Sequence, residues 1–317
     1  MPYRLKSGES IPEGVKRIAL EETQSAADLL GAATARSCDE AIHEARKSVK
    51  KVRALLRLMR PELRSVYARE NIRLRNIGRR LSDFRDRTVV IETFDALLEK
   101  YKDDLQGATL ASIRQGLLRS KRQQQRGPRI GQALQKMAAG LRAAAGRTAA
   151  WPLKADGFKA LAPGLTAAYR KARLAMAAVR ADARPELCHE WRKRVKDHWY
   201  HIRLLEDLWT KVMEGYEKSL KELETWLGDH HNLEVLKDTL TAPSRQFGRP
   251  EEIEQCLDLA AKYQKELIAN SLSLGERIYQ ERPKEFRASL KHLWESWQDQ
   301  PKNRTQVEKQ QRRSAKG

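Results

Sequence analysis

The sequence is poor in cysteine, in aromatic side chains and in long apolar runs. Its three cysteines, Cys38, Cys188 and Cys256, stand far apart, so neither a disulfide framework nor a cysteine-rich zinc site is expected. No uncharged run approaches the roughly 20 residues needed to cross a bilayer, and the N-terminus lacks the apolar core of a secretory signal. We therefore expect a soluble protein of the reducing cytoplasm, without membrane insertion.

Acidic residues are also scarce relative to basic ones. The chain has 62 Lys and Arg against 42 Asp and Glu, which gives a net charge of +20 over 317 residues. Such an excess indicates an anionic partner more than any particular fold. Nucleic acid, a membrane surface and an inorganic polyanion all fit this charge.

Sustained alternation of β-branched residues is missing as well, whereas Ala, Leu, Arg, Lys and Glu dominate, so we predict an all-α protein. Ser37 with Glu40 predicts a capping box ahead of a motif helix over 38–60. Pro185 marks the first turn of a second motif helix that runs to about 208. Further helices are expected over 11–33, 65–81, 84–102, 107–125, 130–148, 211–227, 231–240, 250–281 and 284–298.

Two stretches of the chain are copies of each other. The stretch “IHEARKSVKKVRALLR” (42–57) aligns without a gap with “CHEWRKRVKDHWYHIR” (188–203), at an offset of 146 residues. The same offset matches “LSDFRD” (81–86) with “LGDHHN” (227–232). An internal duplication with short connections between long helices predicts two antiparallel bundles around a pseudo-two-fold axis. We assign residues 1–149 to the first bundle, 150–299 to the second, and 300–317 to a disordered basic tail.

Each motif helix is predicted to carry an apolar stripe with a cationic stripe beside it, because both sets of residues follow a spacing of three and four. The apolar stripes are Ile42, Ala45, Val49, Val52, Leu56 and Met59 in the first copy, and Cys188, Trp191, Val195, His198, Ile202 and Leu205 in the second. The cationic stripes are His43, Arg46, Lys50, Arg53 and Arg57 in the first copy, and His189, Arg192, Lys196 and Arg203 in the second.

The cationic stripes suit an extended phosphate chain chemically. Arginine forks hold oxygen atoms bidentately, and lysines add compact charges. A solvated basic face would explain one such stripe, but two copies matched residue by residue argue against it. The second copy is predicted to bind anions more weakly, because it has Asp197 where the first copy has Lys51 and Trp199 where the first has Arg53.

These residues resemble the conserved histidine α-helical domain family, abbreviated CHAD. The resemblance rests on “HEARKSVKKVR”, “HEWRKRVKDHWYHIR”, the “LSDFRD” and “LGDHHN” turns and the opening “YRLKSGESIPEGVKRIA”, and it covers about residues 3–298. It implies two four-helix bundles related by pseudo-symmetry, with a basic central groove or pore that binds inorganic polyphosphate without catalysis and without a cofactor. It also implies an association with polyphosphate-metabolising proteins or with polyphosphate granules.

The resemblance also implies a set of ligand contacts, carried over position by position. Arg75 and Lys221, which are basic at matched positions of the next helix, are added to this set. The expected polyphosphate contacts are His43, Arg46, Lys47, Lys50, Arg53, Arg57, Arg75, His189, Arg192, Lys193, Lys196, Arg203 and Lys221.

Other chemistries stay open at this point. Sequence-independent nucleic-acid binding needs only a basic surface, although Tyr and Phe do not interleave with the cationic stripes as stacking platforms would. Histidine phosphotransfer would use His43 or His189, each followed three residues later by a cation. A metal site at His189, His198 and His201 lacks an Asp, Glu or Cys to complete it.

No enzyme is expected from the motifs. The chain has no Gly-rich phosphate loop, no nucleophile elbow and no carboxylate pair with metal-binding spacing. Asp83 and Asp229 are matched between the copies, and we expect them to form an internal salt bridge or a helix-end cap.

Overall fold

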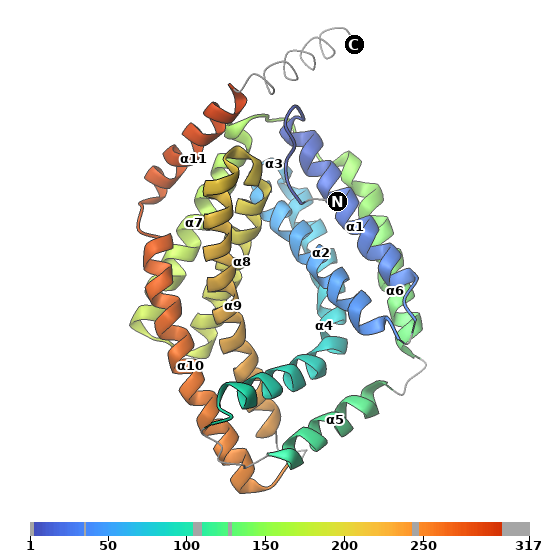
Figure 1. Cartoon of the computed structure of the whole chain (residues 1–317). Helices are drawn as coiled ribbons and strands as arrows, with labels where there is room; N and C mark the ends of the chain where they lie inside the picture. Colours follow the sequence, from blue (N-terminus) through green and yellow to red (C-terminus); the bar gives the residue numbers. More distant parts are fainter. Residues whose placement is uncertain (1–2, 35, 104–109, 126–128, 243–246, 300–317) are drawn as a thin grey trace.

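The computed structural model describes residues 3–34, 36–103, 110–125, 129–242 and 247–299. Every regular element in those ranges is a helix, which confirms the all-α prediction (Figure 1). The tail predicted at 300–317 lies outside the described residues.

Helices α1, α2 and α6 of the first half lie on the right of Figure 1, whereas the teal second half of α4 crosses toward α9 and α10. Helix α1 packs against both α2 and α6, and α2 also contacts α4. The elements are α1 (Ile11–Gly31), α2 (Cys38–Leu58), α3 (Arg60–Leu63), α4 (Ser65–Lys100), α5 (Ala111–Gln125), α6 (Arg129–Arg147) and the short 3-10 helix η1 (Thr148–Ala150).

The second half begins with a long helix that is followed by the second motif helix. Helix α8 packs between α7 and α9, and α10 packs along α9. The elements are α7 (Phe158–Ala181), α8 (Pro185–Leu204), η2 (Glu206–Leu208), α9 (Thr210–Leu240), α10 (Pro250–Ile278) and α11 (Pro283–Gln298). Proline opens α8, α10 and α11, where its missing N–H costs no helical hydrogen bond.

The capping box lies at a different helix from the predicted one. Ser37 makes no cap contact with α2, and its hydroxyl instead accepts a hydrogen bond from the Thr34 N–H at 3.0 Å. A capping box is instead found at the start of α1, where the Ser10 hydroxyl accepts from the Glu13 N–H at 3.3 Å. The Glu13 carboxylate accepts from the Ser10 N–H at 3.0 Å in return.

The predicted helix ends at “LSDFRD” and “LGDHHN” are wrong. Both segments lie inside continuous helices, α4 and α9, so Asp83 and Asp229 cap no helix end. Flanking helix-forming residues and the lack of proline let both helices continue. Figure 1 shows the second half of α4, in teal, running at a wide angle to the first half. The Ser82 hydroxyl donates to the Gly78 carbonyl at 2.9 Å, a contact that bends helices.

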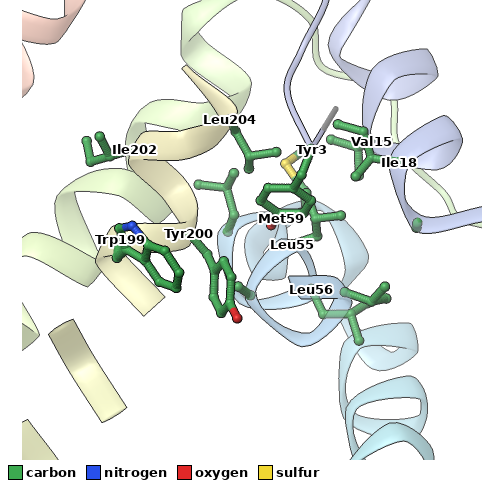
Figure 2. Close-up of a cluster of buried hydrophobic side chains, with 14 of the residues drawn as sticks. Tyr3, Val15, Ile18, Leu55, Leu56, Met59, Trp199, Tyr200, Ile202 and Leu204 are labelled. Atoms are coloured by element: carbon green, nitrogen blue, oxygen red, sulfur yellow. The ribbon is translucent and has the colours of Figure 1, made fainter. Parts of the chain in front are cut away.

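Apolar side chains gather in two clusters, and both draw on the two predicted halves. The larger cluster contains every apolar residue of both stripes of the motif helices, and His198 of the second stripe is buried as well, as predicted. Figure 2 shows part of it, where the Tyr3 and Tyr200 rings meet edge to face beside Leu55. The smaller cluster joins Phe94 of α4 and residues of α5 to Leu236 of α9 and residues of α10. The boundary at residue 149 and the pseudo-two-fold axis stay predictions.

The two halves touch closely where α7 and α8 cross the end of α2. A Cβ atom on Gly164 of α7 would lie 2.1 Å from the Leu58 carbonyl oxygen, so only glycine permits this approach. On α8, His201 Nε2 lies 2.9 Å from the Ala54 carbonyl oxygen and donates to it. These contacts hold α7 and α8 against α2, so the two helices with the predicted cationic stripes, α2 and α8, pack together.

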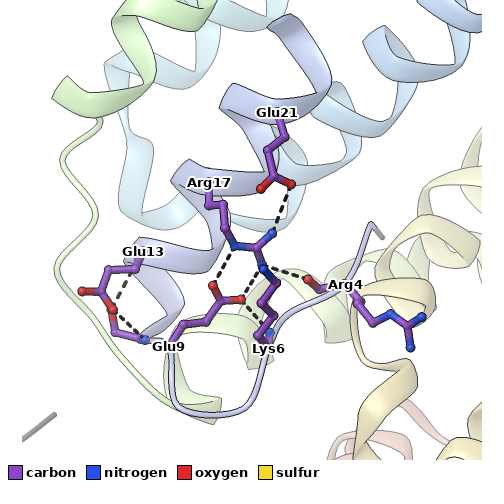
Figure 3. Close-up of polar contacts among 7 residues, drawn as sticks. Arg4, Lys6, Glu9, Glu13, Arg17 and Glu21 are labelled. Carbon is purple, nitrogen blue, oxygen red and sulfur yellow. Dashed lines mark hydrogen bonds and ion pairs between the residues drawn. The ribbon is translucent and has the colours of Figure 1, made fainter. Parts of the chain in front are cut away.

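The N-terminal segment adds a further link between the halves. The Arg17 guanidinium of α1 donates to Glu9 at 2.6 Å and to the Arg4 carbonyl at 3.0 Å (Figure 3). The Leu5 N–H then donates to the Leu204 carbonyl of α8 at 3.0 Å. The segment therefore connects α1 with the end of the second motif helix.

Candidate functional site

The cationic sides of α2 and α8 meet at Lys50. Burial, and then the charges of Lys196 and Arg46, lower the pKa of the partly buried Lys50 well below its usual value. Arg192 of α8 acts in the same direction. Like charges lower a lysine pKa when they lie close and little water screens them. The structure thus brings four of the predicted contacts together, two from each motif helix.

A second group of predicted contacts lies further along α2. Arg53 is partly buried, and its Nε donates to the Asn71 side-chain oxygen of α4 at 3.1 Å. Burial, and then the charge of Arg57, lower the pKa of Arg53 to about 10, with Arg75 of α4 acting in the same direction. The cationic row therefore continues from α2 onto α4.

Asp197, which stands where the first copy has Lys51, forms an ion pair between the two halves. Asp197 Oδ1 on α8 accepts from Arg57 Nη1 on α2 at 2.8 Å. Lys51, the matched residue of the first copy, lies elsewhere, with its Nζ 2.6 Å from Glu22 of α1. The carboxylate of the second copy therefore neutralises a cation of the first.

A buried carboxylate lies among the cations of the second half. Glu224 of α9 is only 3% exposed, and its oxygens contact Lys196 Nζ, Lys221 Nζ at 2.9 Å and Arg192 Nη2 at 3.5 Å. Burial acts to raise the pKa of Glu224, but the three cations hold it at about 2. Glu224 is therefore ionised at neutral pH. Glu224 is not among the contacts predicted from the sequence, and the 146-residue offset matches it with Gly78, which has no side chain to signal a site.

The two matched histidines have different surroundings. The His189 ring lies 4.2 Å from the His231 ring, centroid to centroid. Burial, and then Lys193, lower the pKa of His189, and burial lowers that of His231 to about 4. Both rings are thus uncharged at neutral pH. His43 is partly exposed, with its Nε2 3.8 Å from Glu44 Oε1.

The outer ends of the rows are paired within their own helices. Lys47 Nζ lies 2.8 Å from Glu44 Oε1, and the matched Lys193 Nζ lies 2.7 Å from Glu190 Oε2. Both lysines remain exposed, so these pairs contribute little to stability and leave the lysines accessible to a ligand.

The Trp199 ring lies among cations of the second half. The ring is 8% exposed, and its Nε1 donates to Glu217 Oε1 at 2.6 Å. The centroid lies 4.9 Å from Lys221 Nζ, 5.2 Å from Arg203 Cζ and 5.8 Å from Lys196 Nζ. A ring packed in this way offers no open face on which a nucleic-acid base could stack.

The remaining histidines of α8 pack in the interior. His198 is fully buried, with its Nδ1 3.3 Å from the Tyr279 hydroxyl, and burial lowers its pKa to about 3. In the described part of the chain, no three His, Cys, Asp or Glu residues form a group that could hold a metal ion. Within the same residues, no helix is both long and apolar enough to span a bilayer.

Fold and site together define an all-helical protein with a shielded cluster of cations between two motif helices. The family model of the CHAD domain matches residues 19–241, and the chain belongs to this family. Its structure is similar to the crystal structure of the CHAD domain from the plant Ricinus communis, with a TM-score of 0.56 and 17% sequence identity. That match covers 88% of this chain and 96% of the plant chain, and it shows a shared fold. No curated protein matches the chain.

Proposed function

We propose that the protein binds linear inorganic polyphosphate along α2 and α8 and does not turn it over chemically. The observation that carries this proposal is a cluster of cations from two helices: Arg192 and Lys196 of α8 contact the buried Glu224, and Asp197 of α8 pairs with Arg57 of α2 at 2.8 Å. The lowered pKa of Lys50, caused by burial and then by the charges of Lys196 and Arg46, agrees with cations of both helices lying close together. An anion between them would relieve their mutual repulsion and supply charge-assisted hydrogen bonds. Membership of a family associated with polyphosphate binding supports the same ligand.

The extent of the cationic row favours a chain over a single phosphate. From Arg46 to Arg57, α2 rises by about 16 Å at 1.5 Å per residue, which is longer than one phosphate group can span. Arg75 and Lys221 extend the row onto α4 and α9. The outer predicted contacts, His43, Lys47, His189, Lys193 and Arg203, belong to the ends of the proposed site.

Competition between polyanions tests this function. Long-chain polyphosphate is expected to displace a bound fluorescent RNA at near-equal phosphate concentration, because the site offers cations but no exposed stacking ring. Each neutralised phosphate should add about 0.7 to the slope of log affinity against log salt concentration. If RNA stays bound under these conditions, the protein is a sequence-independent nucleic-acid binder instead.

Binding is expected to take up protons and to weaken as pH rises. In the free protein, burial and then the charges of Lys196 and Arg46 lower the pKa of Lys50, while Glu224 acts in the opposite direction. A bound polyanion raises this pKa again, so the complex holds more protons than the free protein. Affinity should therefore fall with rising pH, by up to about tenfold per pH unit for each proton taken up.

Titrations from neutral pH up to the ordinary lysine pKa of about 10.4 measure this slope. Lys50→Met should flatten it, whereas Lys284→Met, on the exposed side of α11, should leave it unchanged. Lys50→Met should also stabilise the free protein at low pH, since a lowered lysine pKa costs stability below that pKa and the cost vanishes above the ordinary value. Equal slopes for both variants would contradict the assignment of the proton to Lys50.

We further propose that the protein acts in the cytoplasm at polyphosphate granules, near polyphosphate-metabolising proteins. A fluorescent fusion should colocalise with granules in cells that accumulate polyphosphate. Diffuse fluorescence that ignores granule formation would argue against this location.

A further inference from the structure

Three cations of the first half have a matching cation in the second half. The carboxylate that contacts the cations of the second half, Glu224, has no matching carboxylate in the first half. In the alignment of the two copies at an offset of 146 residues, Gly78 of α4 corresponds to Glu224 of α9. The first half thus has no carboxylate at the position where the second half has one. The matched cations are Arg46 with Arg192, Lys50 with Lys196, and Arg75 with Lys221.

Glu224 contacts every cation of its own set. One oxygen accepts from Lys196 Nζ and lies 3.5 Å from Arg192 Nη2, and the other accepts from Lys221 Nζ at 2.9 Å. The carboxylate is buried and ionised, so it is the shared counter-ion of these cations in the free protein. The two carboxylate oxygens take the contacts that two oxygens of a bound phosphate group would make with the same three cations.

We infer that Glu224 is a built-in competitor of phosphate that makes the protein selective for long polyphosphate over orthophosphate and other short anions. A short anion at α8 must displace Glu224 and gains only the contacts that the carboxylate gives up. A long chain anchored at Arg46 and Lys50 brings its next phosphates to α8 at high effective concentration and can displace the carboxylate. This inference rests on the proposed function, because it treats the cations as phosphate contacts.

Glu224→Gln tests the inference, because it keeps the shape of the side chain and removes its charge. Glu222→Gln is the matched control, since Glu222 is exposed on the same helix and the change in net charge is identical. The probes are orthophosphate, tripolyphosphate and long-chain polyphosphate, titrated by calorimetry. Glu224→Gln should bind tripolyphosphate about tenfold more tightly than Glu222→Gln, as one added charge-assisted contact predicts.

The salt dependence separates freed contacts from a general change of charge. Glu224→Gln should steepen the log–log salt slope for long polyphosphate by about 0.7, the value for one added phosphate contact. The ratio of its affinity for long-chain polyphosphate to its affinity for tripolyphosphate should also be smaller than the ratio measured for the wild type. If Glu224→Gln and Glu222→Gln bind tripolyphosphate equally, the inference is overturned even when wild-type binding of long chains is intact.

A converse variant keeps the test decisive if Glu224→Gln does not fold. Gly78→Glu introduces a carboxylate at the position that the 146-residue offset matches with Glu224, one turn after Arg75 on α4, and Gly78→Gln is its uncharged match. A Cβ at this position lies 3.3 Å from Val49 Cγ1, so a small shift accommodates it. Gly78→Glu should bind long polyphosphate about tenfold more weakly than Gly78→Gln. Equal binding by the two variants would overturn the inference.

The two proposals fail separately. If the wild type does not bind long polyphosphate, the proposed function fails. A gain of tripolyphosphate binding by Glu224→Gln over its control would then still show that the carboxylate occupies an anion position.

Discussion

Replacing Arg46 and Lys50 together with alanine is expected to weaken the binding of long-chain polyphosphate by about a hundredfold. Each side chain should contribute a charge-assisted hydrogen bond of about 1.5 kcal/mol, and about 3 kcal/mol corresponds to two orders of magnitude in Kd. The log–log salt slope should fall by about 1.4 with the loss of two phosphate contacts. Fluorescence anisotropy with labelled polyphosphate at several salt concentrations measures both quantities.

The matched control removes one lysine and one arginine from a surface away from the motif helices. Lys284 and Arg287 are exposed on α11, and their double replacement by alanine changes the net charge by the same amount. This control should alter affinity less than threefold, roughly the effect of long-range charge alone. If both double variants lose affinity equally, general charge attracts the ligand and the motif helices are not the site.

Gly164→Ala is expected to destabilise the protein by about 3 kcal/mol, at the upper end of the cost of overpacking a core. The added Cβ would lie 2.1 Å from the Leu58 carbonyl oxygen, so the backbones of α7 and α2 must move apart. This shift would also disturb the alignment of α2 with α8. Thermal unfolding should show a Tm lowered by about 6 °C or more.

Gly146→Ala is the control for this substitution. Nothing lies within 4 Å of a Cβ built at this position of α6, so the same change should stabilise the helix by about 0.5–1 kcal/mol. A Gly164→Ala protein as stable as the Gly146→Ala protein would show that the close approach of α7 and α2 is not required.

The helices were predictable from the sequence because their apolar residues follow the helical period. Both apolar stripes of the motif helices are buried as expected, including His198. The continuity of α4 and α9 through “LSDFRD” and “LGDHHN” was not predictable from the same pattern. Short polar segments favour turns locally, but tertiary packing against neighbouring helices and good helix formers on both sides keep α4 and α9 continuous.

The candidate site was predictable only in part. The cations follow from the duplicated motif, and the structure brings Lys50 close to cations of the second copy. Glu224 was overlooked because a single glutamate in an acidic helix carries no signal until its partners in space are known. The closeness of α2 to α8 depends on Gly164 and His201, whose roles arise from contacts between segments more than 100 residues apart.

Chemical labelling of lysines tests most directly whether α2 and α8 form one shared site. An amine-reactive reagent read out by mass spectrometry would follow Lys50 and Lys196, with Lys284 and Lys291 of α11 as internal references. Added long-chain polyphosphate should protect Lys50 and Lys196 with the same midpoint concentration and leave the α11 lysines unchanged. Protection of all four lysines alike, or of Lys50 and Lys196 at clearly different concentrations, would contradict a single site between the two motif helices.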